Sequence, residues 1–370
     1  MKRTRAPRKL AAAIGWLSLG VLMAAAGAWG ALALAIGPGG GAMRTALAAA
    51  FGVLSLVALG ALWVRGWRWR AFAAQALAFV ALLVWWQTVQ PSNDRDWQDD
   101  VAVLPYATIA GDSVTVHRIR NFDYRSETDY TPGYYDKTFQ VSKLEGIDLV
   151  AVYWMGPAIA HIFVSFAFEG GDHLAVSIET RKEKGEGYST LKGFFRQYEV
   201  VYVVADERDV VRLRTNYRKD PPEQVYVYRM QGPIENGRHL FLNYMEEINA
   251  LKARPKFYNT LTTNCTTNIW QHARSNPGHV QFNWKVLASG YVPEYLYELG
   301  RIDNSLPFDE LQRRVHVNAR AQAAGAAEDF SRRIRDTSLA SGMSAPGLAG
   351  ADPARLPQGQ RSSNSRGVTP

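Results

Sequence analysis

The segment AHIFVSFAFEGGDHLAVSIETR, residues 160–181, alternates apolar and polar residues on both sides of a glycine-containing turn. This pattern predicts a β-hairpin with one buried face, because successive side chains of a strand point to opposite faces. The two apolar rows share a face only if the loop has an odd number of residues, and we place that loop at Gly170-Gly171-Asp172. The side chains expected on the buried face are Ile162, Val164, Phe166, Phe168, Leu174, Val176 and Ile178.

The opposite face of the hairpin carries polar residues that are able to do chemistry. In the predicted register Phe163 lies across from Glu179, so His161 and Glu179 are diagonal neighbours within reach of each other. A glutamate beside a histidine holds the imidazole in one tautomer and stabilises its charged form. The alternative is that Glu179 simply pairs with Arg181, as exposed charges on strands commonly do.

The only cysteine of the chain, Cys265, lies in the segment LTTNCTTNIW, residues 261–270. Thr and Asn residues are favourable N-caps, so we expect a helix to begin close to Cys265. Unsatisfied amides and the helix dipole at this position favour a thiolate, and the same amides can donate to an oxyanion. The alternative is a small buried apolar residue, as free cysteines often are.

These features together predict a nucleophile, a base and a residue that orients the base, which are Cys265, His161 and Glu179. The other histidines have no comparable setting, and His173, at the end of the hairpin, is the rival base. We assign substrate-binding roles to Asn264, Thr266, Tyr258 and Arg181.

Three apolar runs without a charged residue precede this region, at residues 10–36, 45–64 and 71–89. A bilayer core of ~30 Å needs about 20 apolar helical residues, so each run is long enough to span it. Basic residues flank the N-terminus and the second loop, which predicts a cytoplasmic N-terminus and an outer domain after residue 90. We expect a multi-pass protein of the bacterial inner membrane, anchored by its spans, whose periplasmic cysteine has no disulfide partner within the chain.

We divide the chain into a basic cytoplasmic N-terminus, three transmembrane helices, a periplasmic thiol catalytic domain and a disordered tail. Strand-like patterns up to residue 205, followed by helical spacing in residues 236–253, predict an α+β domain with an antiparallel sheet and helices. The corresponding boundaries are residues 1–9, 10–90, 91–320 and 321–370.

Two further segments have distinctive compositions. Residues 321–370 are rich in Ala, Ser, Gly, Pro and Arg, so we expect disorder apart from a short helix around residues 321–336. Residues 122–139 are rich in tyrosine, and we expect a surface loop or, alternatively, a lid or a lipid-contacting rim.

The charge and ligand patterns exclude other classes of function. The formal net charge of +8 lies largely in the cytoplasmic flanks and the C-terminal tail, and no nucleic-acid motif is present. No group of His, Asp and Cys residues has metal-ligand spacing, so we expect neither a metal nor a cofactor.

With these residues in view, the sequence resembles the family described as the Lnb N-terminal periplasmic domain. The resemblance rests on residues 117–139, 161–186 and 258–270, and it covers about residues 115–290. It implies a papain-like thiol fold of the circularly permuted, NlpC-type order, with the histidine before the cysteine. It also implies that Cys265 is the nucleophile, His161 the base and Glu179 the third polar residue.

The resemblance implies a lipoprotein N-acyltransferase, which moves a fatty acyl chain from phospholipid through a Cys265 thioester to an amine. Its partners are then the membrane, phospholipid and a lipoprotein or peptide. The order of segments differs from that of the family's named member, because here the membrane spans precede the domain. Two alternatives remain open: a periplasmic cysteine peptidase or amidase acting on peptidoglycan or peptides, and a non-enzymatic, membrane-anchored binding module.

Overall fold

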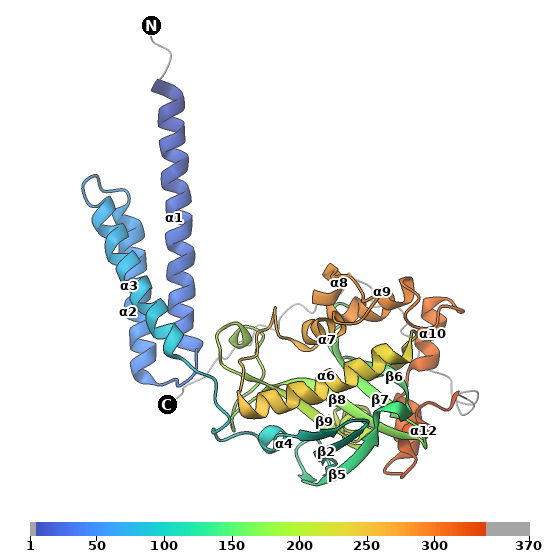
Figure 1. The fold of residues 1–370 in the computed structure, drawn as a ribbon. Coiled ribbons are helices and arrows are strands. Elements are labelled where there is room, and N and C mark those ends of the chain that lie inside the picture. Colours follow the sequence, from blue (N-terminus) through green and yellow to red (C-terminus); the bar gives the residue numbers. More distant parts are fainter. Residues whose placement is uncertain (1–4, 338–370) are drawn as a thin grey trace, which may run out of the picture.

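The computed structural model describes residues 5–337 and shows a bundle of three helices with an outer domain beside its base (Figure 1). The bundle consists of α1 (Arg5–Ile36), α2 (Ala42–Ala61) and α3 (Arg68–Thr88). All three helices are long and apolar enough to cross a membrane. The predicted apolar runs are therefore confirmed as helices of transmembrane length, and we call residues 91–337 the outer domain.

The three helices pack closely because small residues line their contacts. At Gly30 an added Cβ would lie 2.3 Å from the Phe51 ring and 2.7 Å from Leu82, so a larger residue does not fit there. The buried side chain of Gln75 donates from Nε2 to the carbonyl of Met23 at 2.8 Å. The spans therefore form one packed unit.

The outer domain is attached to the base of this bundle by residues 195 and 196. The Phe195 ring lies 6.3 Å from the Trp29 ring of α1 and belongs to one buried cluster with Trp86 of α3. The Arg196 guanidinium lies 4.8 Å from the centre of the Trp86 ring and donates to the carbonyl of Val89 at 3.2 Å. These contacts hold one edge of the outer domain against the bundle.

The outer domain is an α+β structure built on one eight-stranded sheet. The strand order is β1-β2-β9-β8-β7-β6-β10, and β5 also pairs with β2. Neighbours are antiparallel except β2 and β9, which are parallel, so the sheet is mixed and the predicted antiparallel sheet is corrected. The strands are β1 (Tyr106–Ala110), β2 (Ser113–Arg120), β5 (Tyr134–Gln140), β6 (Leu144–Tyr153), β7 (His161–Phe168), β8 (Asp172–Arg181), β9 (Glu199–Ala205) and β10 (Gln224–Arg229).

The predicted hairpin is formed by β7 and β8, with a register that differs by two residues from the prediction. Phe168 pairs with Asp172, so the three-residue loop is 169–171 and begins one residue earlier than expected. The number of loop residues is still odd, which keeps the apolar rows on one face. Extending this register places His161 directly across from Glu179 instead of diagonal to it.

Helices cover both faces of the sheet. On one face α6 (Ile234–Ala253) packs Phe241 and Tyr244 against Phe166 of β7, with α7 (Cys265–Ala273) beside it. The other face is covered by α5 (Glu207–Arg212), the π-helical turn η3 (Leu213–Tyr217), α11 (Asn318–Ala324) and α12 (Phe330–Arg333). The remaining helices are α4 (Asp99–Ala102), η1 (Val141–Lys143), η2 (Lys192–Phe194), α8 (Trp284–Leu287), η4 (Ser289–Tyr291), α9 (Val292–Glu298) and α10 (Phe308–Val315).

The folded domain extends further toward the C-terminus than predicted. Ala321, Phe330 and Ile334 are buried in the same cluster as Val210 of α5. The predicted boundary at residue 320 is therefore too early, because a few well-spaced apolar residues are enough to bury α11 and α12. The single short helix predicted around residues 321–336 is present as two, the end of α11 and α12. The rest of the predicted tail, residues 338–370, lies outside the described residues.

The tyrosine-rich segment is folded and is not a free loop. Its two short strands, β3 (Asp123–Tyr124) and β4 (Tyr130–Thr131), pair with each other, and its rings form a buried cluster with Leu213 and Tyr217. Beneath them the buried Asp209 carboxylate accepts from the Phe122 amide. The segment is therefore more ordered than the predicted surface loop, although residues 125–129 are exposed at the surface. Its roles as a lid or a lipid-contacting rim stay predictions.

Candidate active site

The helix that carries the cysteine begins where the sequence predicts. Asn264 is the N-cap of α7: its Oδ1 accepts from the Thr267 amide at 2.8 Å, and its own amide donates to Thr267 Oγ1 at 3.0 Å. This reciprocal cap places Cys265 at the first helical position. The Thr266 hydroxyl donates to Asn264 Oδ1, and the Asn264 side-chain amide donates to the Thr260 carbonyl, so both side chains hold the helix start. Their substrate-binding roles stay predictions.

The sulfur of Cys265 is half-buried against the end of β7. The His161 side chain and the backbone N–H of Ile162 both lie close enough to Sγ to lower the pKa of the Cys265 thiol. The pairing of β7 with β8 runs only from Val164 inward, which leaves the Ile162 amide available for the sulfur. The strand that carries the histidine therefore supplies two hydrogen-bonding groups to the thiol.

The other side of the His161 ring is held by two oxygens. Its Nε2 lies 2.7 Å from Ser177 Oγ and 3.1 Å from Glu179 Oε1, and the Ser177 hydroxyl donates to Glu179 Oε1 at 2.7 Å. Because Nε2 is engaged in this way, Nδ1 is the nitrogen left to face the sulfur of Cys265. The structure thus brings the predicted nucleophile, base and orienting carboxylate together.

Two positioning residues in this arrangement escaped the sequence analysis. Arg214, in η3, places its Nη2 2.9 Å from Glu179 Oε1, while its Nη1 lies 3.2 Å from Glu223. The sequence contained a signal for Ser177, because this residue lies two positions before Glu179 and therefore on the same face of the strand. Arg214 carries no such signal, since it comes from an irregular turn 35 residues away from Glu179.

Arg181 does not reach this site. Its guanidinium donates to the carbonyls of Val101 at 3.0 Å and Ala102 at 2.8 Å, and it lies 4.3 Å from the centre of the Trp97 ring. The segment that follows the bundle therefore covers Arg181, which is only 2% exposed. Both its predicted substrate-binding role and the alternative ion pair with Glu179 are corrected.

Tyr258 lies near the thiol of Cys265, whereas His173 lies at the far end of the hairpin. Tyr258 is buried, and burial together with the nearby Cys265 thiolate raises its pKa far above the usual range. It therefore presents a neutral phenol near the sulfur, and its substrate-binding role stays a prediction. The Nδ1–H group of His173 donates to the Gly171 carbonyl at 2.9 Å in the hairpin loop, at the opposite end of β7 and β8 from His161.

Burial and charge together set the protonation states of the site. Burial raises the pKa of the Cys265 thiol, but the His161 hydrogen bond and positive charge, with the Ile162 amide, outweigh burial and lower it. For His161, burial lowers the pKa, whereas the Glu179 carboxylate and Cys265 raise it, to about 9. For Glu179, burial raises the pKa, whereas His161 and Arg214 hold it well below its usual range. These shifts favour a thiolate–imidazolium pair.

The region that contains this arrangement matches a known family. Residues 130–290 match the family model of the Lnb N-terminal periplasmic domain. This match confirms the resemblance drawn from the sequence and includes His161, Glu179 and Cys265. No curated protein and no solved structure matches the chain. The match and the three apolar helices together indicate a membrane protein with a periplasmic domain.

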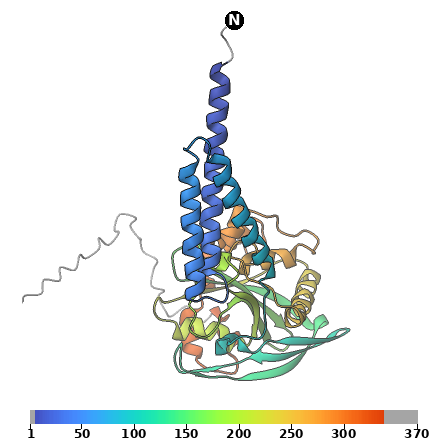
Figure 2. The ribbon, with the colours of Figure 1, turned by 90° about the vertical axis from the view of Figure 1, so that its left-hand side faces the viewer.

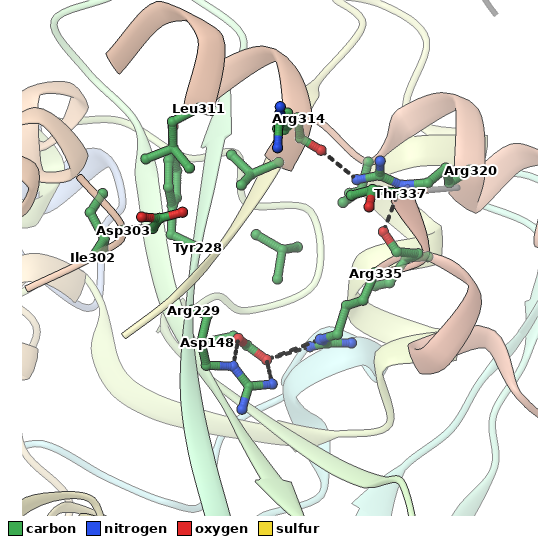
Figure 3. A pocket seen from close by; sticks show the side chains of 14 residues that line it. Asp148, Tyr228, Arg229, Ile302, Asp303, Leu311, Arg314, Arg320, Arg335 and Thr337 are labelled. Atoms are coloured by element: carbon green, nitrogen blue, oxygen red, sulfur yellow. Dashed lines mark hydrogen bonds and ion pairs between the residues drawn. The ribbon is translucent and has the colours of Figure 1, made fainter. Parts of the chain in front are cut away.

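The region that matches the family model is adjoined by a cavity of about 300 Å³, which is lined mainly by β10, α10 and the segment after α11 (Figure 3). Figure 3 shows the Asp148 carboxylate between Arg229, at 2.7 Å, and Arg335, also at 2.7 Å. The charge of the Asp148 carboxylate is therefore neutralised by these two arginines. Neither Cys265 nor His161 lines the cavity. Among residues 5–337, no group of three or more His, Cys, Asp or Glu side chains is arranged to hold a metal ion.

The lowered pKa of Cys265 and the raised pKa of His161 predict a bell-shaped pH dependence for a reaction in which Cys265 is the nucleophile and His161 the acid. The rate should rise as the thiol ionises, below the pKa of ~8.5 of a free cysteine. It should fall when His161 loses its proton, at about 9, because the imidazolium is needed to protonate the leaving group. Alkylation of Cys265 by iodoacetamide should show the acidic limb only, since it needs the thiolate alone. An alkylation midpoint at or above that of a free thiol would contradict the ion pair.

Proposed function

We propose that this protein is a membrane-anchored cysteine acyltransferase that moves a fatty acyl chain from phospholipid through a Cys265 thioester to an amine. One observation carries the proposal: Cys265, at the start of α7, lies beside His161, whose Nε2 is held by Ser177 and Glu179. The arrangement and its chain order, with the histidine before the cysteine, support a papain-like site. The acceptor we propose is the N-terminal amine of a lipoprotein.

In the first step the thiolate of Cys265 attacks the ester carbonyl carbon of the phospholipid. The negative charge that develops on the carbonyl oxygen is stabilised by backbone amides at the start of α7, where Cys265 and Thr266 precede the capped amide of Thr267. As the carbon–oxygen bond breaks, His161 gives its proton to the departing alcohol oxygen. The products are a lysophospholipid and an acyl thioester on Cys265.

In the second step an amine attacks the thioester carbonyl. His161, now neutral, takes the proton from the amine nitrogen, and the carbon–sulfur bond breaks to release Cys265 as a thiolate. Glu179 and Ser177 hold Nε2 throughout, so Nδ1 exchanges the proton at the reacting atoms. Arg214 keeps Glu179 ionised, and its role is positioning.

The position of the domain supports a lipid substrate. The positive-inside rule places the N-terminus in the cytoplasm and the outer domain in the periplasm, which is where the lipidated ends of bacterial lipoproteins lie. The segment that packs on the bundle through Phe195 also contacts the loop before α7, since Thr260 Oγ1 donates to the Thr190 carbonyl at 2.8 Å. The thiol helix is thus tied closely to the base of the membrane bundle, which raises the effective concentration of lipid-borne substrate.

The proposal is tested with the full-length protein in nanodiscs of one defined phospholipid. We expect intact-protein mass spectrometry to show an adduct with the mass of one acyl chain, which neutral hydroxylamine removes because it cleaves thioesters. Addition of a lipopeptide with a free N-terminal amine should discharge the adduct and acylate the peptide. Release of muropeptides without an acyl adduct would instead indicate an amidase, and the absence of both reactions would indicate a binding module.

A further inference from the structure

Large apolar side chains are exposed in an unusual concentration around the thiol of Cys265. Six of them, each between 41% and 59% exposed, come from four separate segments of the outer domain. Scattered exposed apolar residues are normal in soluble proteins, but a group around one site marks an interaction surface. We call this group the apolar rim, and it consists of Ile159, Leu191, Phe194, Leu261, Phe282 and Trp284.

One half of the apolar rim lies between the thiol helix and the bundle. Leu261 is four residues before Cys265, and the neighbouring Thr260 packs against the segment that carries Leu191 and Phe194. The packing is close: a Cβ added at Gly193 would lie 2.2 Å from Thr260 Oγ1. These three apolar side chains therefore border the cysteine on its bundle side.

The other half borders the histidine and α7. The amide of Gly290 donates to the Ala158 carbonyl at 3.0 Å, which holds the segment with Trp284 against the residues that precede His161, where Ile159 lies. The Phe282 ring lies 5.1 Å from the Trp270 ring of α7. The two halves of the apolar rim therefore stand on either side of the Cys265–His161 pair.

The position of the apolar rim relative to the bundle identifies its partner. In Figure 1, α7 and α8 lie on the upper side of the outer domain, and the bundle extends upward in the same direction. Helix α8 is level with the lower part of the bundle. Figure 2, turned by 90°, shows the bundle in front of the upper part of the outer domain and rising above it. Phe194 is followed directly by Phe195, which packs on Trp29 of α1, so the apolar rim is continuous with the transmembrane surface.

We propose that the apolar rim inserts into the bilayer leaflet that borders the outer domain, so that the thiol site opens directly onto acyl chains. Tryptophan and phenylalanine are the residues that favour the interfacial region of a bilayer. Each apolar side chain that leaves water contributes favourably, at roughly 25 cal/mol per Å². Insertion is a property of the surface and does not require the chemistry proposed for Cys265, so the two proposals can fail separately.

The single cysteine makes this proposal directly testable. In the cysteine-free Cys265→Ala protein, we would introduce Leu261→Cys or Trp284→Cys and label the new thiol with an environment-sensitive nitrobenzoxadiazole dye. The matched control is Ile109→Cys on β1, since Ile109 is 40% exposed. Its partner strand β2 lies along the lower side of the domain, away from α7 and α8 (Figure 1).

In nanodiscs we expect the dyes at the rim positions to emit at shorter wavelength than the Ile109→Cys dye. Phospholipid carrying a spin label on its acyl chain should quench them at least twofold more strongly. Equal emission and equal quenching at all three positions would overturn the insertion. A blue shift that increases with protein concentration, without quenching by the spin-labelled lipid, would also overturn the insertion. It would indicate contact between copies of the chain instead. Quenching at the rim without an acyl adduct on the wild-type protein would retain insertion and reject the proposed transferase.

Discussion

Replacing Cys265 by alanine is expected to reduce acyl-adduct formation and acyl transfer by at least ~10³-fold, to the limit of detection, because it removes the nucleophile. The substitution deletes one sulfur from a half-buried position, so we expect a cost in stability of about 1 kcal/mol or less. Cys265→Ser should lose nearly as much activity, since an alcohol ionises far less readily than a thiol. The measurement is the rate of adduct appearance by mass spectrometry, with thermal unfolding recorded for each variant.

The control for this prediction is Thr262→Ala, an exposed position three residues before the cysteine on the same loop. It should leave both the adduct and the unfolding transition unchanged. If the Cys265→Ala protein still transferred acyl chains at the wild-type rate, the thiol mechanism would be rejected. If cells carrying Cys265→Ala retained full function while the wild-type protein formed no adduct, the binding-module alternative would be supported.

Replacing His161 by glutamine is the second change with a large expected effect. Loss of a general acid and base typically costs ~10² to 10⁴-fold in rate, and we expect a decrease in adduct formation within that range. A structural role would not by itself change the ionisation of Cys265, so a second measurement separates the two. Because the positive charge and hydrogen bond of His161 lower the pKa of the thiol, His161→Gln should move the midpoint of iodoacetamide alkylation to higher pH.

The matched control for His161 is His239→Gln, an exposed histidine on α6. This variant should keep both the rate of adduct formation and the alkylation midpoint of the wild-type protein. An unchanged midpoint in His161→Gln would show that the imidazole does not act on the sulfur, and the base would then have to be sought elsewhere. A midpoint shift without a decrease in rate would limit His161 to a positioning role.

The buried charges around the histidine explain why its geometry is stable. Glu179 and Arg214 lose hydration inside the domain, and each is compensated by more than one partner. Glu179 accepts from Ser177 and Arg214 and contacts His161, while Arg214 also contacts Glu223. Because Glu179 Oε1 is held by both Ser177 and Arg214, the imidazole that it contacts needs little reorganisation when the charge on the thiol changes.

Local patterns in the sequence were sufficient to predict several elements. The three apolar runs are long and lack charge, and helices of matching length occupy them. The alternation in residues 160–181 indicates which apolar side chains share one face of the hairpin, since side chains alternate with a period of two. The prediction of a single buried face was wrong, because helices bury the other face as well. The start of α7 at Cys265 follows from Asn264, whose side chain caps the first turn.

Other features depend on contacts that no local pattern encodes. Alternation is satisfied by any hairpin loop with an odd number of residues, so the register was predicted two residues away from the observed one. Residues 321–337 were predicted as one short helix within a disordered tail, because their apolar residues are few and become significant only when they pack against α5. Arg181 was expected near Glu179, yet the carbonyls of Val101 and Ala102 bind it elsewhere.

The sequence by itself determined which residues can do the chemistry: one thiol at a helix start, and one histidine on a strand face that also carries a glutamate. A helix start and a strand face each depend on residues only a few positions apart, so the spacing of residues along the chain is enough to predict them. Only the tertiary structure decided that the Cys265 sulfur meets His161, that Arg214 holds Glu179, and that apolar side chains gather around the pair. Those contacts join segments far apart in the chain, and the packing of the sheet against its helices brings them together.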